Sequence, residues 1–178
     1  IDRDGNQEIV TIVNSGYDYR LVILDLSGNI KYQSRDLIRK PANTAPALAD
    51  IDADGFLEIL VAAKNNIYAF NHNGTLVTNY PFAADSTYSV TEVVNGWLIT
   101  TDVDFVYNSS LVLGDINSDG ISDIIIGSPQ YGILGFDARK GKALEYFPLM
   151  TKGVVNPAPL LFDLDKDGDL EIAVGDNN

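Results

Sequence analysis

Short apolar runs recur along the chain, and each is closed by a polar turn that often contains glycine. Residues 44–83 show the unit most clearly, with apolar stretches at 46–49, 59–62 and 67–70 and a mixed stretch at 75–80. The runs are short and rich in branched or aromatic residues, which favours β-strands, and no segment keeps a helical period. The pattern predicts four strands joined by three tight connections in this unit, and an all-β chain.

The same pattern predicts further strand pairs on both sides of this unit. Residues 21–32 and 133–146 each read as two strands around a glycine-containing turn, which is typical of the outer hairpin of a repeat. An extra hairpin is predicted inside residues 84–107, where 88–94 and 97–101 flank Asn95-Gly96. Two roles fit this hairpin: an insertion that covers a sheet edge, or a protrusion that binds a partner through its Trp97.

An acidic loop of the form Asp-x-Asp/Asn-x-Asp-Gly-x-x-Asp/Glu occurs four times, each time before an apolar run. The copies occupy residues 1–8, 50–58, 115–123 and 163–171, and the first lacks only the opening acid. The loop glycines are 50, 65 and 48 residues apart, so the period is near fifty. This is the length of a four-stranded propeller blade.

The repeats therefore predict an incomplete β-propeller of about three to four blades, with an acidic loop between the first two strands of each blade. The expected strand counts are three, four, four and two, which are too few for a closed ring, so the chain is expected to be part of a larger propeller. Residues 1–178 are assigned to one domain, with blades at about 1–40 (partial), 44–83, 108–150 and 156–178 (partial), and the inserted hairpin at 84–107.

The net charge of −13 lies entirely in the acidic loops. Fifteen of the 25 acids fall inside them with only Arg3 and Lys166 as bases, and the remaining acids and bases cancel. Carboxylates packed this closely repel one another unless a cation lies between them. Ca²⁺ accepts six to eight oxygens at about 2.3–2.6 Å from Asp, Asn, Glu and main-chain carbonyls, whereas Mg²⁺ keeps its waters. The loops therefore predict calcium sites.

The loop spacing predicts which residues bind the ion. Side chains at loop positions 1, 3, 5 and 9 turn inward, glycine at position 6 permits a left-handed backbone, and position 7 offers its carbonyl. The expected ligands, loop by loop, are Asp2, Asp4, Asn6 and Glu8; Asp50, Asp52, Asp54, Phe56 and Glu58; Asp115, Asn117, Asp119, Ile121 and Asp123; and Asp163, Asp165, Asp167, Asp169 and Glu171.

Hairpin turns and EF-hands share parts of this loop pattern. Asp-Gly is a common hairpin turn signal, but four copies in one register argue against turns alone. An EF-hand opens in the same way, yet it needs a Glu at position 12 and flanking helices. Here position 12 is Val61, Ile126 or Val174, and the flanks read as strands. The pattern therefore favours calcium loops inside β-hairpins.

Residues 110–129, Ser-Leu-Val-Leu-Gly-Asp-Ile-Asn-Ser-Asp-Gly-Ile-Ser-Asp-Ile-Ile-Ile-Gly-Ser-Pro, resemble the FG-GAP and VCBS repeats of integrin-type β-propellers. Blades 44–83 and 156–178 look more like the secreted bacterial variety, with Glu at loop position 9. The resemblance implies that each loop joins the first two strands of a blade and binds calcium structurally.

Few residues suggest catalysis, so no enzymatic activity is expected. His72 is the sole histidine and no cysteine is present, which leaves no nucleophile and base pairing around it. Asp102 and Asp104 fit an acid pair or a further metal site, with a solvated strand or loop as the alternative. The basic turn 139–142 lacks aromatic neighbours, so nucleic-acid binding is not expected. No segment approaches the roughly 20 apolar residues of a membrane span.

Three functions remain open from the sequence. The first is an extracellular or cell-surface adhesion module, secreted and stabilised by calcium, that binds a protein or a glycan. The second is the non-catalytic propeller portion of a secreted enzyme such as a polysaccharide lyase or hydrolase. The third is a rigid spacer without a ligand of its own. The absence of cysteine means that calcium, rather than disulfides, would restrain the loops.

Overall fold

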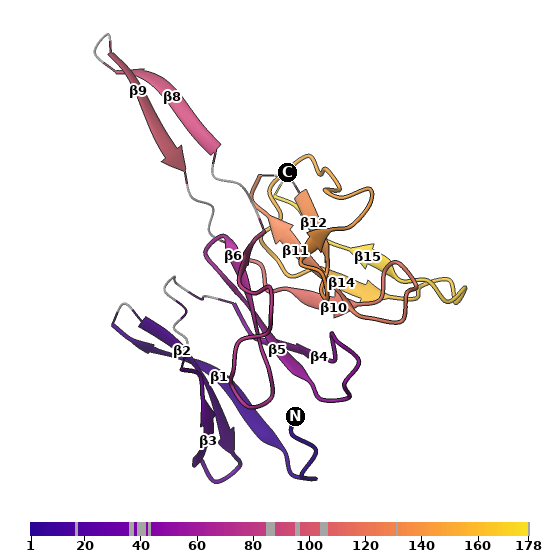
Figure 1. The fold of residues 1–178 in the computed structure, drawn as a ribbon. Helices are drawn as coiled ribbons and strands as arrows, with labels where there is room; N and C mark the ends of the chain where they lie inside the picture. The colour runs from indigo at the N-terminus through magenta and orange to yellow at the C-terminus, as the bar shows by residue number, and fades with distance from the viewer. Residues whose placement is uncertain are drawn as a thin grey trace.

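The computed structural model describes residues 1–16, 18–35, 38, 42, 44–84, 88–94, 97–103, 107–130 and 132–177, with the main chain only for 88–94 and 97–103. These residues form antiparallel sheets and no helix (Figure 1), which confirms the predicted all-β class. None of the described segments is a helix that is long and apolar enough to cross a membrane.

Strands that follow one another in the chain pair with one another, so each sheet is a meander. The first sheet contains β1 (Glu8–Ser15), β2 (Asp18–Asp25) and β3 (Ile30–Gln33). The second contains β4 (Ala47–Ala49), β5 (Glu58–Ala63), β6 (Asn66–Phe70) and β7 (Phe82–Ala83). The third contains β10 (Val112–Gly114), β11 (Asp123–Ser128), β12 (Gly132–Asp137) and β13 (Lys142–Ala143). The fourth pairs β14 (Leu160–Phe162) with β15 (Glu171–Ala173).

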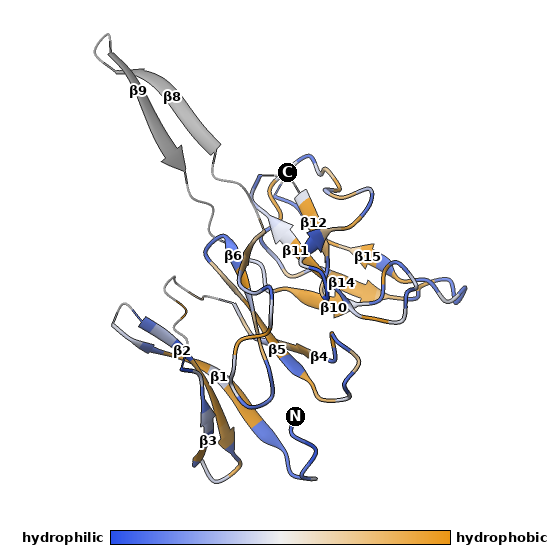
Figure 2. Cartoon of the chain, in the orientation of Figure 1, coloured by the Kyte–Doolittle hydropathy of each residue, from blue (hydrophilic) through white to orange (hydrophobic). Residues whose placement is uncertain are grey.

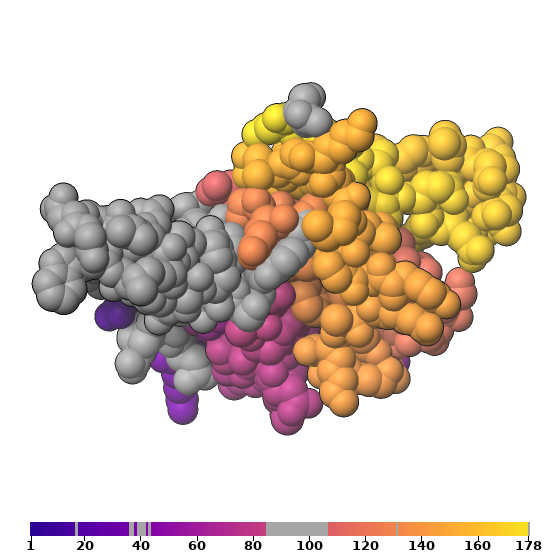
Figure 3. Space-filling model, turned by 90° about the horizontal axis from the view of Figure 1, so that it is seen from above, coloured from indigo at the N-terminus to yellow at the C-terminus, as the bar shows by residue number. Residues whose placement is uncertain are grey.

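These four sheets hold three, four, four and two strands, the counts expected from the apolar runs. They lie in chain order across the molecule, from the indigo first sheet to the yellow fourth (Figure 1), and the view from above shows the magenta, orange and yellow parts in the same order (Figure 3). Within the part of the chain that the structure describes, they fan out without closing into a ring (Figure 1). Each complete acidic loop connects the first two strands of its sheet, between β4 and β5, β10 and β11, and β14 and β15.

The outer strand of the second sheet differs from the prediction. The stretch 75–80 was expected to be a strand, but it meets β6 through a bridge between Phe70 and Leu76 and a hydrogen bond from Val77 N to Ala69 O, and the chain returns as β7 at Phe82–Ala83. Asn79 adopts a left-handed φ of 71° and Pro81 has no N–H to donate, so the ladder is interrupted. The third sheet repeats this turn, because Tyr146 has a φ of 69° and precedes Phe147-Pro148.

The core lies between neighbouring sheets, and β5 contributes to it on both faces. Leu60 and Ala62 belong to a cluster shared with β11 and β12 of the third sheet. Ile59, Val61 and Ala63 belong to a second cluster shared with β2 of the first sheet. This burial on both faces explains the uninterrupted apolar run after the acidic loop. Figure 2 shows hydrophobic residues along the inner strands and hydrophilic residues in the connecting loops.

The predicted hairpin is present as strands β8 (Tyr88–Val94) and β9 (Trp97–Val103), paired in register. Its turn, Asn95-Gly96, lies outside the described residues, as does Asp104. The hairpin projects away from the other sheets (Figure 1), and neither strand contacts another described strand. The described strands therefore give no support to the prediction that it covers a sheet edge.

Candidate metal centres

The four acidic loops adopt one backbone shape. The glycine at position 6 has φ values of 85°, 87°, 86° and 101° in successive loops, which confirms its predicted left-handed conformation. Position 4 is also left-handed in every loop, although it is never glycine: Arg3, Ala53, Ser118 and Lys166 have φ values of 62°, 63°, 57° and 66°. No signal in the sequence marks position 4, since its residue types share nothing.

The same hydrogen bonds recur in the three complete loops. In the second loop, Asp54 N donates to Asp52 Oδ1 at 3.1 Å, Gly55 N to Asp50 Oδ2 at 2.9 Å, and Phe56 N to Asp54 Oδ1 at 2.7 Å. The equivalent bonds in the third and fourth loops are 2.8–3.3 Å long. Main-chain amides therefore hold the carboxylates at positions 1, 3 and 5, so the loop is organised by its own acids.

The acid at position 9 lies beneath the loop at the start of the second strand. Its carboxylate accepts the N–H of position 2: Ile51 N to Glu58 at 3.0 Å, Ile116 N to Asp123 at 3.1 Å, and Leu164 N to Glu171 at 2.6 Å. In the first loop the nitrogen of Ile1 donates to Glu8 at 2.6 Å. One carboxylate oxygen of the position 9 acid is used in each of these bonds.

The second loop brings three predicted ligands together. One oxygen each of Asp50, Asp52 and Glu58 lie within 4.8 Å of one another. Glu58 is fully buried, and its Oε1 atom has no hydrogen-bond partner; the same holds for the buried Asp50 Oδ1. Burial of a carboxylate oxygen without a partner is costly, and a hard cation between the oxygens removes that cost. The residues present therefore fit a calcium ion.

Burial and like charge both act on the position 9 acids of the second and third loops. Burial raises the pKa of Glu58 to about 7, the other acids of its loop add to the rise, and the hydrogen bond from Ile51 opposes it. Burial raises the pKa of Asp123 to about 6, with a smaller contribution from Asp119. Both shifts are those of carboxylates crowded by negative charge and shielded from water.

The third and fourth loops share this geometry with two differences. In the third, Asn117 replaces the acid at position 3, and its Nδ2 lies 3.3 Å from Asp123 Oδ1. In the fourth, Asp163, Asp165 and Glu171 place one oxygen each within 4.8 Å, but the first two are exposed and Glu171 is half-buried. The predicted contribution of the position 7 carbonyls stays a prediction in all loops.

The first loop differs because a lysine from β3 enters it. Lys31 Nζ lies 2.8 Å from Asp2 Oδ2, 2.7 Å from Asp4 Oδ2 and 2.9 Å from Glu8 Oε1. These three carboxylates also form a group within 4.8 Å. Hydrogen bonding to Lys31 lowers the pKa of Asp2 and lowers that of Asp4 to about 2. The nitrogen of Ile1, and after it Lys31, lower the pKa of Glu8.

Neighbouring loops touch through equivalent positions. Arg3, at position 4 of the first loop, lies over the Phe56 ring at position 7 of the second, with its guanidinium carbon 5.2 Å from the ring centroid. Ser118, at position 4 of the third loop, donates to Asp169 at position 7 of the fourth at 3.2 Å. The loops of adjacent sheets therefore lie side by side.

The residues outside the loops show structural contacts. His72 stacks on Phe56, with ring centroids 4.2 Å apart. In the basic turn, Lys140 pairs with Asp137. The side chain of Asp102 lies outside the described residues.

Comparisons with known proteins support a repeat identity for part of the chain. A search of the curated proteins found no match. Among solved structures, the crystal structure of the V. cholerae biofilm matrix protein Bap1 is similar, with a TM-score of 0.48 and 18% identity over 97% of this chain and 32% of that one. The chain thus spans about a third of the length of that structure. Residues 107–144, which contain the third sheet and its acidic loop, match the FG-GAP repeat family, and this confirms the resemblance seen at 110–129.

Proposed function

We propose that this chain is a calcium-stabilised part of a β-propeller that serves as an extracellular binding or adhesion module. The observation that carries the calcium proposal is the pair of buried oxygens in the second loop, Asp50 Oδ1 and Glu58 Oε1, which have no hydrogen-bond partner. Both lie in a loop whose shape is repeated four times. Unsatisfied oxygens inside a repeated loop shape favour a shared ligand over a local defect.

The proposed propeller places all the calcium loops on one side of the sheets, at the turns between first and second strands. An ion there would neutralise the acids and fix the connection between the two strands. Free calcium is abundant outside cells, where modules bind it with dissociation constants of about 10⁻⁴–10⁻³ M. This, together with the FG-GAP match at residues 107–144, supports an extracellular location.

Calcium titration by calorimetry and by thermal melting tests the metal proposal. Calcium should raise the melting temperature, because it binds the folded state, and a concentration of 100 times Kd stabilises by about 2.7 kcal/mol. Asp50→Asn should remove one bound ion per chain, since an amide supplies one neutral oxygen in place of a carboxylate. Asp18→Asn is the matched control, because Asp18 carries the same charge on β2, away from the loops.

An unchanged melting temperature with and without calcium would contradict the metal proposal, as would equal ion counts in Asp50→Asn and Asp18→Asn.

The adhesion proposal needs a separate experiment. Retention of the protein on immobilised glycans and matrix proteins, compared in calcium and in EDTA, should show binding that is lost with the ion. Failure to bind either class in calcium would favour a rigid spacer.

We also propose that the chain carries no catalytic site of its own. This is supported by the position of its sole histidine, whose ring packs on Phe56, and by the use of the loop acids as acceptors for main-chain amides. Polysaccharide cleavage assays with the purified chain test it, and any turnover that survives removal of contaminating enzymes would contradict it.

A further inference from the structure

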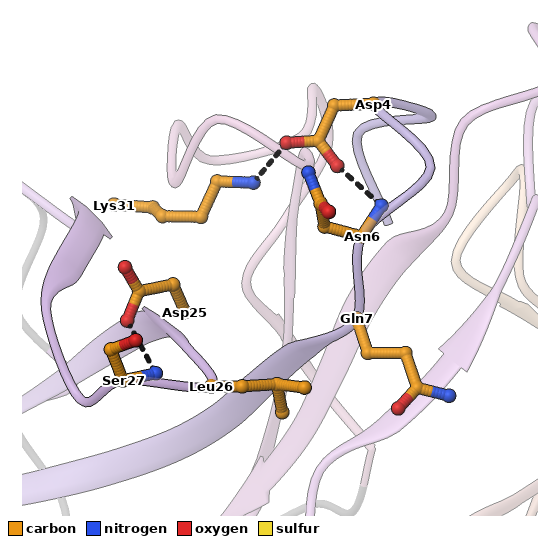
Figure 4. A pocket seen from close by; sticks show the side chains of 7 residues that line it. All are labelled: Asp4, Asn6, Gln7, Asp25, Leu26, Ser27 and Lys31. Atoms are coloured by element: carbon orange, nitrogen blue, oxygen red, sulfur yellow. Dashed lines mark hydrogen bonds and ion pairs between the residues drawn. The ribbon is translucent and has the colours of Figure 1, made fainter.

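The ammonium group of Lys31 takes up the centre of the first acidic loop. Its Nζ lies 2.7–2.9 Å from one oxygen of each of Asp2, Asp4 and Glu8. Figure 4 shows the side chain extending from β3 toward Asp4, across a pocket of about 380 Å³. A calcium ion bound at about 2.3–2.6 Å from the same oxygens would occupy the same space. The ammonium and the ion therefore exclude one another.

The matching positions in the second and third sheets are occupied by apolar residues. The turn before Lys31 has the bonds Asp25 N to Asn29 O and Gly28 N to Asp25 O, and the second sheet repeats them as Asn71 N to Thr75 O and Gly74 N to Asn71 O. Counted from this turn, Lys31 aligns with Val77, and a β-bulge between Ile23 and Leu24 then places Tyr32 opposite Ile23. In the third sheet, Leu144 N donates to Gly135 O just as Val77 N donates to Ala69 O, which aligns Leu144 with the same position.

Val77 and Leu144 differ in their neighbours: one packs against the core and the other lies beside an acidic loop. Val77 packs against the core cluster shared by the second and third sheets. Leu144 lines a pocket beside Asn117 of the third loop, so this position faces the acidic loop there as well. A lysine at this position therefore distinguishes the first repeat from the second and third. Its methylene chain is long enough to bring the ammonium group into the acidic loop.

The charge environment of the first loop also differs from that of the second. In the second loop two buried carboxylate oxygens lack a partner. In the first, the group of three carboxylates is satisfied: Glu8 Oε1 accepts from Lys31, and Glu8 Oε2 accepts from Ile1. The first loop therefore lacks the unpartnered buried oxygens that make the second fit a calcium ion.

We propose that Lys31 replaces the divalent ion in the first acidic loop, so that the first repeat folds independently of calcium while the other repeats depend on it. The contrast with the other loops rests on the proposed function, but the role of Lys31 does not. One consequence is that calcium withdrawal should loosen the second to fourth loops and leave the first ordered.

Crystals of the wild-type protein grown with excess calcium give the most direct test, through anomalous scattering from the ion. Ions in the second to fourth loops with Lys31 in the first support the inference. An ion in the first loop, with Lys31 turned away, overturns it. This measurement does not depend on a variant that folds.

Lys31→Met gives an independent test, with Lys140→Met as the matched control. Lys140 lies in the equivalent hairpin of the third sheet and pairs with Asp137 instead of a loop acid. Lys31→Met should melt at a lower temperature than Lys140→Met in EDTA, because three carboxylates lose their cation. Calcium should recover the difference, with one more ion bound per chain than in the control.

Equal melting temperatures of the two variants in EDTA overturn the inference. A Lys31→Met protein that is as stable without a bound cation as with one also overturns it. If wild-type crystals show no ion in any loop, the proposed calcium function and the contrast between repeats are both wrong, and the EDTA comparison then decides only whether Lys31 neutralises the first loop. A lower melting temperature for Lys31→Met supports it in that case.

Discussion

Glu8 and Glu58 occupy the same loop position and carry opposite pKa shifts. The nitrogen of Ile1 and Lys31 lower the pKa of Glu8, whereas burial raises that of Glu58 to about 7. Both side chains accept a hydrogen bond from the main-chain nitrogen at loop position 2, which is Ile1 N for Glu8 and Ile51 N for Glu58. The difference therefore comes from the Lys31 ammonium group beside Glu8 and from the burial of Glu58 among like charges.

This raised pKa predicts how stability changes with pH when calcium is absent. Between its ordinary value of 4.5 and about 7, Glu58 holds a proton in the folded state and has lost it in the unfolded state. The contribution of Glu58 to the free energy of unfolding therefore falls as the pH rises through that interval. Melting in EDTA should show Glu58→Gln losing less stability than the wild type between pH 5 and pH 8.

Excess calcium should change the sign of this dependence, because the ion binds the ionised carboxylate and protons compete with it. The wild type should then be more stable at pH 8 than at pH 5. Identical pH profiles for the wild type and Glu58→Gln in EDTA would contradict the assignment. Asp123 contributes in the same direction in both proteins, so it cancels from the comparison.

Among the strands, close packing between adjacent segments depends on glycines. Gly127 of β11 lies against Val155, and a Cβ placed there would be 2.6 Å from both Val155 O and Val155 Cγ1. Gly114 of β10 lies in the same way against Leu161 of β14 and Leu170 of the fourth acidic loop. The contacts of Gly114 let the fourth sheet pack directly on the third, and Gly127 does the same for the segment before β14.

Gly127→Ala should destabilise the protein by about 1–3 kcal/mol, because the added methyl group would lie 2.6 Å from the main-chain oxygen of Val155, so that one of the two segments must shift. Urea unfolding measures the change. The matched control is Gly175→Ala, where a Cβ would meet nothing within 4 Å. Similar midpoints for the two variants would show that Gly127 is not needed for this close approach.

Across the whole molecule, the sheets are joined by a shared apolar core and by polar contacts between them. Tyr80 is buried, and its hydroxyl donates to Ala138 O at 2.5 Å, which connects the second sheet to the third. Ser109 makes a comparable link, since it donates to Pro157 O at 3.0 Å in the segment before β14. Because apolar contacts are non-directional, these hydrogen bonds set the spacing of neighbouring sheets.

Tyr80→Phe should cost about 1–3 kcal/mol, because Ala138 O is left buried without that donor while the ring still fills its space. Chemical unfolding followed by circular dichroism measures it. Tyr146→Phe is the control, since Tyr146 is 83% exposed. A loss of the same size in both variants would mean that the hydroxyl of Tyr80 does not join the sheets.

The repeat could be predicted from the sequence, because strand formation and loop shape depend on local features. Apolar runs with branched residues predicted the strands and their number in each sheet, and the glycine at loop position 6 predicted the left-handed turn. The outer strand at 75–80 was predicted wrongly, because the left-handed turn at Asn79 and the missing N–H of Pro81 end the ladder.

The cationic partners of the loops could not be predicted, because they depend on contacts between distant segments. Lys31 is 23 residues from Glu8 in the chain, and its presence in the first loop depends on how β3 pairs with β2. The burial of Glu58 likewise depends on the sheets that pack around β5. Spacing along the chain places carboxylates together, but the positions of distant charges and the loss of water around them arise only when the sheets assemble.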